Sequence, residues 1–213
     1  MLKIKKFVFS PFSENTFVLW DEVNRDACVV DPGCSNESEE NELAEFIHEK
    51  KLNIKYLINT HCHIDHIFGN AFIKANYKPI YLAPEKDVFL LEKAEEQAEL
   101  FGMSIKKSPA PDKFITENEN IKLGDYFGKY LYTPGHTPGE FCLYFETEKM
   151  CITGDVLFKE GIGRTDLWGG NYNTLMQSIN KKLLTLAEDV TIYPGHGEFS
   201  TIGYEKNNNS FLL

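Results

Sequence analysis

Residues 60–70 read Thr-His-Cys-His-Ile-Asp-His-Ile-Phe-Gly-Asn, which places three histidines and an aspartate within six positions. The chain has six histidines, and two of the other three, His136 and His196, each follow a Pro-Gly pair. Neutral imidazole and carboxylate are ligands that divalent metals of borderline hardness prefer. A fold that contains this segment has to bring distant histidines to it. The sequence therefore predicts a metal-dependent enzyme.

The length and composition of the chain allow one large domain. With 213 residues and 42% hydrophobic content the chain can bury a substantial core, so we expect a single domain over residues 1–213. No apolar run approaches the roughly 20 residues that a membrane-spanning helix needs. The first nine residues include lysines but lack the long apolar stretch and cleavage site of a signal peptide. We therefore expect a cytoplasmic protein without a membrane partner.

The net charge and the cysteines indicate which partners and which cellular compartment the protein has. The formal net charge of −10, with scattered Lys and Arg, argues against nucleic acid, because phosphate-binding proteins cluster their basic residues. An odd number of cysteines without a C-x-x-C pair does not suit a disulfide framework, and it favours a reducing compartment. The five cysteines are Cys28, Cys34, Cys62, Cys142 and Cys151.

The spacing of apolar residues along the chain predicts the order of the helices and strands. A helix with an apolar stripe at Leu43 and Ile47 follows three strands in the first 31 residues, and a second helix runs from Pro84 to Gly102. Further strands are expected over 54–59, 120–123, 129–132, 141–145, 150–153 and 190–193, with a helix over 174–186. Two mixed sheets packed face to face with helices outside satisfy this order. The expected fold is an α/β, four-layer αββα sandwich with the site along one rim.

The spacing of the candidate ligands suggests how each one reaches the site. His61 and His63 are two residues apart, so in extended backbone their side chains point the same way and Cys62 points into the core. Asp65 and His66 come just afterwards, where the chain turns into a helix. The other three candidate ligands each follow a glycine at the end of a predicted strand. They are His136, Asp155 and His196.

Seven candidate ligands are too many for one open metal site. A single catalytic zinc needs about three protein ligands and a water, whereas two metals that share a bridging carboxylate need about seven. We place His61, His63 and His136 on one metal. Asp65, His66 and His196 go on the other, and Asp155 bridges the two because its strand lies apart from both clusters in the sequence.

These motifs resemble those of the metallo-β-lactamase-fold superfamily. The H-x-H-x-D-H element of residues 61–66 is highly specific, and it is joined by Gly135-His136, Gly154-Asp155 and Gly195-His196. Asp31-Pro32-Gly33 and the run Gly163-Arg164-Thr165-Asp166 extend the match over nearly the whole chain. The ending from Pro194 onward resembles the short, single-domain glyoxalase II-like hydrolases.

The resemblance implies an αββα metallo-β-lactamase-like fold, two divalent metal ions and hydrolysis of a small-molecule thioester such as S-lactoylglutathione. Two cations a few Å apart lower the pKa of a bridging water toward neutrality, and the hydroxide then attacks the thioester carbonyl. Asp65 orients this hydroxide as well as ligating metal, so it is the catalytic residue. Zinc is favoured among the metals, with iron and manganese as alternatives, because imidazole and carboxylate suit all three.

Two other functions fit the same scaffold. Persulfide dioxygenases share the H-x-H-x-D-H and Gly-Arg-Thr-Asp elements but use one iron, which His61, His136 and Asp155 would hold here. A non-catalytic binding protein would be expected to have lost ligands, and all seven are present. The metal, the acyl group and the thiol carrier stay open, as does the choice between a monomer and a small homo-oligomer. Arg164 is expected to pair with Asp166, and His48 to be solvated.

Overall fold

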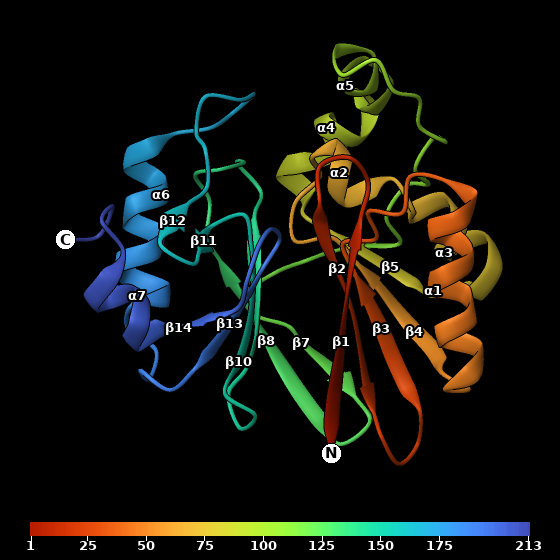
Figure 1. The fold of residues 1–213 in the computed structure, drawn as a ribbon, viewed down its shortest axis with the longest axis horizontal. Helices are drawn as coiled ribbons and strands as arrows, with labels where there is room; N and C mark the ends of the chain where they lie inside the picture. Colours follow the sequence, from red (N-terminus) through yellow and green to blue (C-terminus); the bar gives the residue numbers. More distant parts are fainter. The chain divides into compact units, whose positions relative to one another are not determined.

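The computed structural model describes residues 1–213, which divide into two compact units. The first comprises Met1–Phe114 with Lys122–Tyr126, and the second Ile115–Ile121 with Phe127–Leu213. Each unit contains a β-sheet with helices packed on it (Figure 1). That the two units make up one domain stays a prediction.

The first sheet has six strands in the order β1-β2-β3-β4-β5-β6. Antiparallel hairpins join the first three strands, whereas β3, β4, β5 and β6 run parallel to their neighbours. The strands are β1 (Leu2–Phe9), β2 (Glu14–Asp21), β3 (Asp26–Val30), β4 (Asn53–Ile58), β5 (Ile80–Ala83) and β6 (Lys113–Phe114). The carboxyl ends of β3 and β4 meet at one edge, because Val30 pairs with Ile58.

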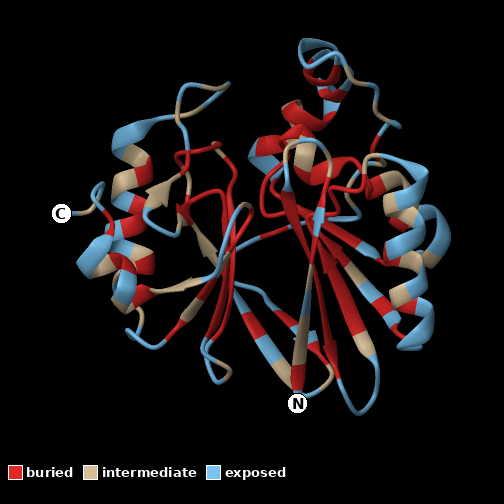
Figure 2. Ribbon diagram, viewed as in Figure 1, coloured by how far each residue is buried: buried red, intermediate tan, exposed pale blue.

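Helices of the first unit cover one side of this sheet. The core that they share with the sheet contains Leu43 and Ile47 of α1 and Ile73 of α3, and both helices expose their opposite faces (Figure 2). The helices are α1 (Glu37–Glu49), α2 (Ile64–Ile67), α3 (Asn70–Tyr77), η1 (Glu85–Asp87), α4 (Val88–Glu92) and α5 (Ala94–Leu100).

The second sheet has the order β14-β13-β10-β9-β8-β7. Its strands are β7 (Asn120–Leu123), β8 (Tyr126–Tyr132), β9 (Phe141–Phe145), β10 (Met150–Gly154), β13 (Thr191–Pro194) and β14 (Ser200–Thr201). A separate two-stranded hairpin consists of β11 (Leu157–Phe158) and β12 (Gly161–Ile162). Strands β10 and β13 are parallel neighbours. Their register shifts between Ile152 and Gly154, and their carboxyl ends then pair at Gly154 and Pro194.

Three helical segments complete the second unit, and they are α6 (Tyr172–Ser178), the π-helical η2 (Ile179–Leu183) and α7 (Ile202–Asn208). Leu175, Ile179 and Leu183 are fully buried against the sheet. Four residues make slightly more than one turn of an α-helix and slightly less than one turn of a π-helix. Side chains four apart are therefore offset around the axis in opposite directions in the two kinds of helix. The change at residue 179 therefore keeps this stripe facing the sheet.

Two sequence-based expectations about helices are wrong in detail. The helix expected from Pro84 to Gly102 is three short segments, because the chain turns at Lys93 and the buried Gln97 amide donates to the Leu90 carbonyl at 2.8 Å. Asp65 and His66 do not precede a helix but lie inside α2, which begins directly after His63. Every helix in the chain is too short or too polar to cross a lipid bilayer.

The start of α1 gives a test of local stability. The Asn36 side chain caps the helix by accepting a hydrogen bond from the Glu39 amide at 3.1 Å. Replacing Asn36 with Ala removes this acceptor and is expected to lower the free energy of unfolding by about 1 kcal/mol. Urea denaturation measures the change, and Asn36→Asp, which keeps a capping oxygen, should retain the wild-type value. Equal stability of all three proteins would show that the cap contributes nothing.

Candidate metal centre

Four of the seven predicted ligands converge in the loop and helix that follow β4. The rings of His61 and His63 are nearly perpendicular with centroids 5.0 Å apart, and those of His61 and His66 are 4.0 Å apart. A potential ligand atom of His61 lies within 4.8 Å of one on each of these two histidines, and His66 and Asp65 satisfy the same limit. His61 and His66 are fully buried, and Asp65 is partly exposed. Cys62 between the two histidines is a buried core residue, as predicted.

The surroundings of these imidazoles determine which nitrogen is available as a ligand. His66 Nδ1 faces the buried Asp31 carboxylate, with 3.2 Å between Nδ1 and Oδ2. His61 Nδ1 lies 3.1 Å from Thr60 Oγ1, whose hydrogen is donated to Asp31 Oδ2 at 2.6 Å. From these neighbours we assign the proton of each ring to Nδ1, which leaves the lone pair on Nε2.

Asp31 is held where β3 and β4 end side by side. Its Oδ1 accepts from the Thr60 amide at 2.7 Å, and its own amide donates to the Ile58 carbonyl at 2.9 Å. Its φ of 49° is in the left-handed region, which Asp tolerates better than most residues. Because β3 and β4 are parallel neighbours, Asp31 reaches Thr60, 29 positions later in the chain, and also contacts His66.

In the second unit, one carboxylate oxygen lies between two imidazoles. Asp155 Oδ2 is 3.5 Å from His136 Nε2 and 3.6 Å from His196 Nε2. Asp155 and His196 follow the paired ends of β10 and β13, and the Gly195 amide donates to the Gly154 carbonyl at 2.8 Å. The parallel pair thus delivers both side chains to the same edge. His196 has 28% of its side chain exposed, whereas His136 has 2%.

Backbone contacts fix the orientation of His136 and Asp155. His136 Nδ1 donates to the Arg164 carbonyl at 2.7 Å, which places the lone pair on Nε2. The Asp155 amide donates to Oε1 of the fully buried Glu140 at 2.8 Å. Gly135 has a φ of 140°, and a Cβ there would lie 2.2 Å from the Leu175 amide nitrogen, so only glycine is accommodated before His136.

The donor chemistry of both clusters suits divalent metal ions. Each cluster combines imidazoles with a carboxylate. In His61, His66 and His136 the Nδ1 atom contacts another protein group, so Nε2 is the nitrogen available to a metal. The structure brings His61, His63, Asp65 and His66 together in the first unit. It brings His136, Asp155 and His196 together in the second.

Two expectations outside the ligand set, on Arg164 and His48, are confirmed, and two buried acids support the site without having been predicted. Arg164 pairs with Asp166 through two hydrogen bonds of 2.7 and 2.6 Å, which lowers the pKa of Asp166 to about 2. His48 is exposed, as expected. The buried acids Glu14 and Glu140 were not assigned a role. The sequence signal for both is a glutamate at the start of an apolar strand, Glu14 in β2 and Glu140 directly before β9.

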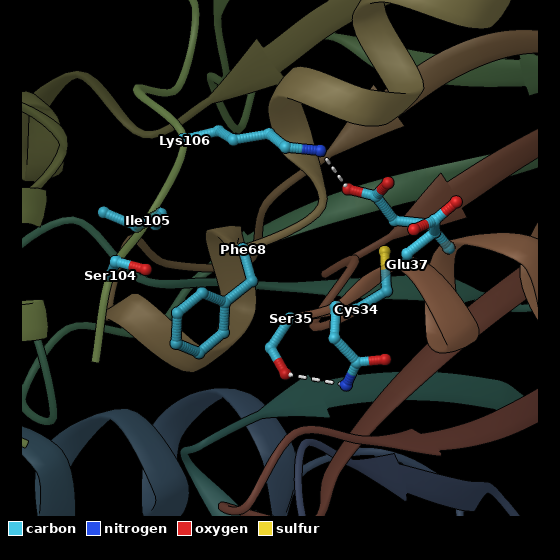
Figure 3. A pocket seen from close by; sticks show the side chains of 9 residues that line it. Cys34, Ser35, Glu37, Phe68, Ser104, Ile105 and Lys106 are labelled. Atoms are coloured by element: carbon cyan, nitrogen blue, oxygen red, sulfur yellow. Dashed lines mark hydrogen bonds and ion pairs between the residues drawn. The ribbon is translucent and has the colours of Figure 1, made fainter. Parts of the chain in front are cut away.

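A separate cavity of about 350 Å³ lies in the first unit beside the start of α1 (Figure 3). An ion pair of 2.8 Å between Lys106 Nζ and Glu40 Oε1 borders it. Burial raises the pKa of Cys34, so its thiol stays protonated. The lining consists of Cys34, Ser35, Asn36, Glu37, Glu40, Phe68, Ser104, Ile105 and Lys106. This set contains none of the seven predicted metal ligands.

The chain belongs to the metallo-beta-lactamase superfamily, which it matches over residues 10–196. The hydroxyacylglutathione hydrolase GloC of Haemophilus influenzae is 40% identical over 213 residues, which cover 99% of this chain and 98% of that protein. The human mitochondrial persulfide dioxygenase ETHE1 is 32% identical over 210 residues, which cover 96% of this chain and 74% of that protein.

Solved structures support the same family. The BLEG-1 B3 metallo-beta-lactamase has a TM-score of 0.91 and 30% identity, and the alignment covers 99% of this chain and all of that one. TTHA1623, crystallised in a di-iron-bound form, has a TM-score of 0.87 and 29% identity over 98% and 100% of the two chains. The predicted mixed α/β, metallo-β-lactamase-like fold is confirmed, and the family implies divalent metal ions.

Two glycines in one loop provide a matched test of how the second cluster is packed. A Cβ at Gly163 would lie 1.8 Å from the Asp155 carbonyl oxygen and 3.2 Å from His136 Cβ, whereas at Gly161 the nearest atom is 3.7 Å away. Gly163→Ala is expected to destabilise the protein by about 2 kcal/mol or more, because backbone atoms have to move. Gly161→Ala should stay close to wild type in the same thermal unfolding experiment. Equal melting temperatures for the two variants would contradict this packing.

Proposed function

We propose that the protein is a metal-dependent hydrolase that cleaves a small-molecule thioester of the hydroxyacylglutathione type. The observation that carries the proposal is Asp155 Oδ2, which lies within 3.6 Å of Nε2 of both His136 and His196. A carboxylate oxygen that lies between two imidazoles suits a ligand shared by two metals, because we assign these two imidazoles to different ions. The GloC hydrolase supports the substrate class, because it is similar along almost its full length.

We keep the assignment of ligands that the sequence suggested. His61, His63 and His136 would hold one ion, and Asp65, His66 and His196 would hold the other. Asp155 would be their shared ligand. The Nε2 assignment of His61, His66 and His136 agrees with this division, because each ring turns its protonated Nδ1 away toward Thr60, Asp31 or Arg164.

The chain's own residues account for the rest of the chemistry. Bound divalent cations supply hydroxide near neutral pH and polarise a carbonyl oxygen. Asp65 is the more exposed carboxylate of the first cluster, with Oδ2 3.8 Å from His66 Nε2, so it can accept a hydrogen bond from the attacking water and orient it. His196 is the most exposed of the five imidazoles in the two clusters, which favours entry of substrate on its side. We propose zinc as the metal, with iron as the alternative that the di-iron form of TTHA1623 suggests.

The resemblance to glyoxalase II enzymes bears on the thiol carrier, because in them a tyrosine that contacts glutathione directly follows the cysteine of this segment. Here Leu143 follows Cys142, and the tyrosine comes one place later. Tyr144 of β9 lies in the core under α6 with 8% exposure, together with Leu175 and Ile179. It therefore does not supply a phenol to a bound thiol. We propose a monomer or a small homo-oligomer in the cytoplasm that acts on a small molecule and binds neither nucleic acid nor membrane.

Persulfide dioxygenation is the second candidate, and the similarity to human ETHE1 favours it. This activity would require a single iron on His61, His136 and Asp155. Four predicted ligands would then hold no metal, and they are His63, Asp65, His66 and His196. Persulfide dioxygenases keep such residues, so we favour the hydrolase on the run Gly195-His196-Gly197 and the residues after it, which resemble the glyoxalase II-like hydrolases.

Substitution of the bridging carboxylate tests the dinuclear site. Asp155→Ala is expected to reduce S-lactoylglutathione hydrolysis by more than about 100-fold and to lower the bound metal together with it, since losing a direct ligand exceeds the roughly 10–100-fold effect of its supporting residues. Metal analysis and a thioester assay on the same preparation measure both. Asp166→Asn, an exposed carboxylate at Arg164, is the control. Full turnover by metal-free Asp155→Ala protein would exclude the proposal.

Substrate preference separates the two candidate reactions. The zinc-loaded protein should hydrolyse S-lactoylglutathione, and the iron-loaded protein should consume no oxygen when it is supplied with glutathione persulfide. An oxygen electrode and a thiol-release assay measure these activities. Oxygen uptake that depends on persulfide, without thioester cleavage, would assign the protein to the dioxygenases.

A further inference from the structure

A glutamate lies completely buried behind the first ligand cluster. Glu14, the first residue of β2, has 0% exposure, and its Oε1 accepts no hydrogen bond. Its other oxygen, Oε2, lies 2.7 Å from Thr16 Oγ1. Burying a carboxyl group in this way is costly, so its retention calls for a specific role.

Thr16 connects this glutamate to the turn that contains Asp31. The Thr16 hydroxyl accepts a hydrogen bond from the Gly33 amide at 2.8 Å and lies 2.9 Å from the Asp31 carbonyl oxygen. It thus holds both ends of the Asp31-Pro32-Gly33 segment. Since Asp31 adopts a left-handed φ of 49°, this segment needs such support to keep its shape.

The turn is also shaped to receive the glutamate. A Cβ added to Gly33 would lie 2.1 Å from Glu14 Oε2 and 2.7 Å from the Asp65 carbonyl oxygen. The carboxyl group therefore packs directly on the Cα of Gly33, in the space that the missing side chain leaves. A shorter residue at position 14 would leave a void beside this turn and remove a partner of Thr16.

We propose that Glu14 is a positioning residue for His66, acting through Thr16 and Asp31. Glu14 and Thr16 fix the turn, the turn fixes the Asp31 carboxylate, and the carboxylate lies 3.2 Å from His66 Nδ1 and sets the direction of the ring. This inference rests on the proposed function, because it assumes that His66 Nε2 is a metal ligand.

The protonation of Glu14 is consistent with this arrangement. Burial raises the pKa of Glu14 well above its usual range, the charges of Asp31 and Asp65 raise it further, and His66 and Thr16 lower it. Thr16 has one hydroxyl hydrogen and two oxygen neighbours, Glu14 Oε2 and the Asp31 carbonyl. A neutral carboxylic acid can donate to Thr16, which leaves the threonine hydrogen for Asp31. A glutamine at position 14 has nearly the same size, and its side-chain NH₂ group can also donate a hydrogen bond to Thr16.

Cobalt(II) binding to variants of the full chain tests the proposal without measuring catalysis. Glu14→Ala and Thr16→Val should weaken cobalt affinity by roughly 10–100-fold, the usual effect of residues that orient metal ligands, and should change the visible absorption spectrum of the bound ion. Glu14→Gln and Thr16→Ser keep the hydrogen-bonding groups and should restore the wild-type spectrum and an affinity close to wild type.

Glu205 provides the control for the loss of a buried acid. It is also fully buried and accepts from the Glu160 amide and from Asn209 Nδ2, both at 2.8 Å, at α7 in the second unit. Glu205→Ala should lower thermal stability without changing the cobalt spectrum. Thr16→Val changes the fewest atoms, so it decides the outcome if Glu14→Ala does not fold.

Three results would overturn the proposal. The first is a wild-type spectrum and affinity in Thr16→Val or in folded Glu14→Ala, and the second is a loss in Glu14→Gln as large as in Glu14→Ala. A wild-type protein that binds no cobalt would overturn both this proposal and the metal site. Failure of the thioester assay with normal cobalt binding would contradict only the proposed hydrolysis.

Discussion

The Asp31 carboxylate is the contact on which the first ligand cluster depends. It accepts two hydrogen bonds from Thr60, through the amide and the hydroxyl, and faces the Nδ1 of His66. Its burial and its left-handed backbone are both unfavourable by themselves, and these contacts offset them. The consequence is chemical as well as structural. Because the Thr60 hydrogen is committed to Asp31, the tautomers of both His61 and His66 are set by one side chain.

Parallel strand pairs explain why the candidate ligands gather at particular ends of the sheets. In the first unit the ends of β3 and β4 bring Asp31 beside residues 59 and 60, and in the second the ends of β10 and β13 bring Asp155 beside His196. Side chains that follow adjacent parallel strands share one edge, so residues far apart in the sequence meet there. Glycines at 135 and 163 then allow the close backbone approach that places His136.

The ligands could be predicted from sequence because their signal is local. An H-x-H-x-D-H run and glycine-histidine pairs at strand ends state both the residue type and its position. The groups behind the ligands could not be predicted in the same way. The role of Glu14 depends on the space above Gly33, and that of Asp31 on the β3–β4 register, and neither is visible in a strand pattern. At the break at Lys93 the Gln97 side chain donates to the Leu90 carbonyl, a contact that the helical period across 84–102 does not reveal, so that period predicted one helix.

We propose that seven side chains hold two metal ions and that the buried network around Asp31 orients His61 and His66. Anomalous X-ray scattering from crystals of the metal-loaded protein tests it most directly, because each bound ion appears as a separate peak at its absorption edge. Two peaks are expected, one beside His61, His63 and His136 and the other beside Asp65, His66 and His196, with Asp155 near both. A single peak held by His61, His136 and Asp155, or no peak near these residues, would contradict it.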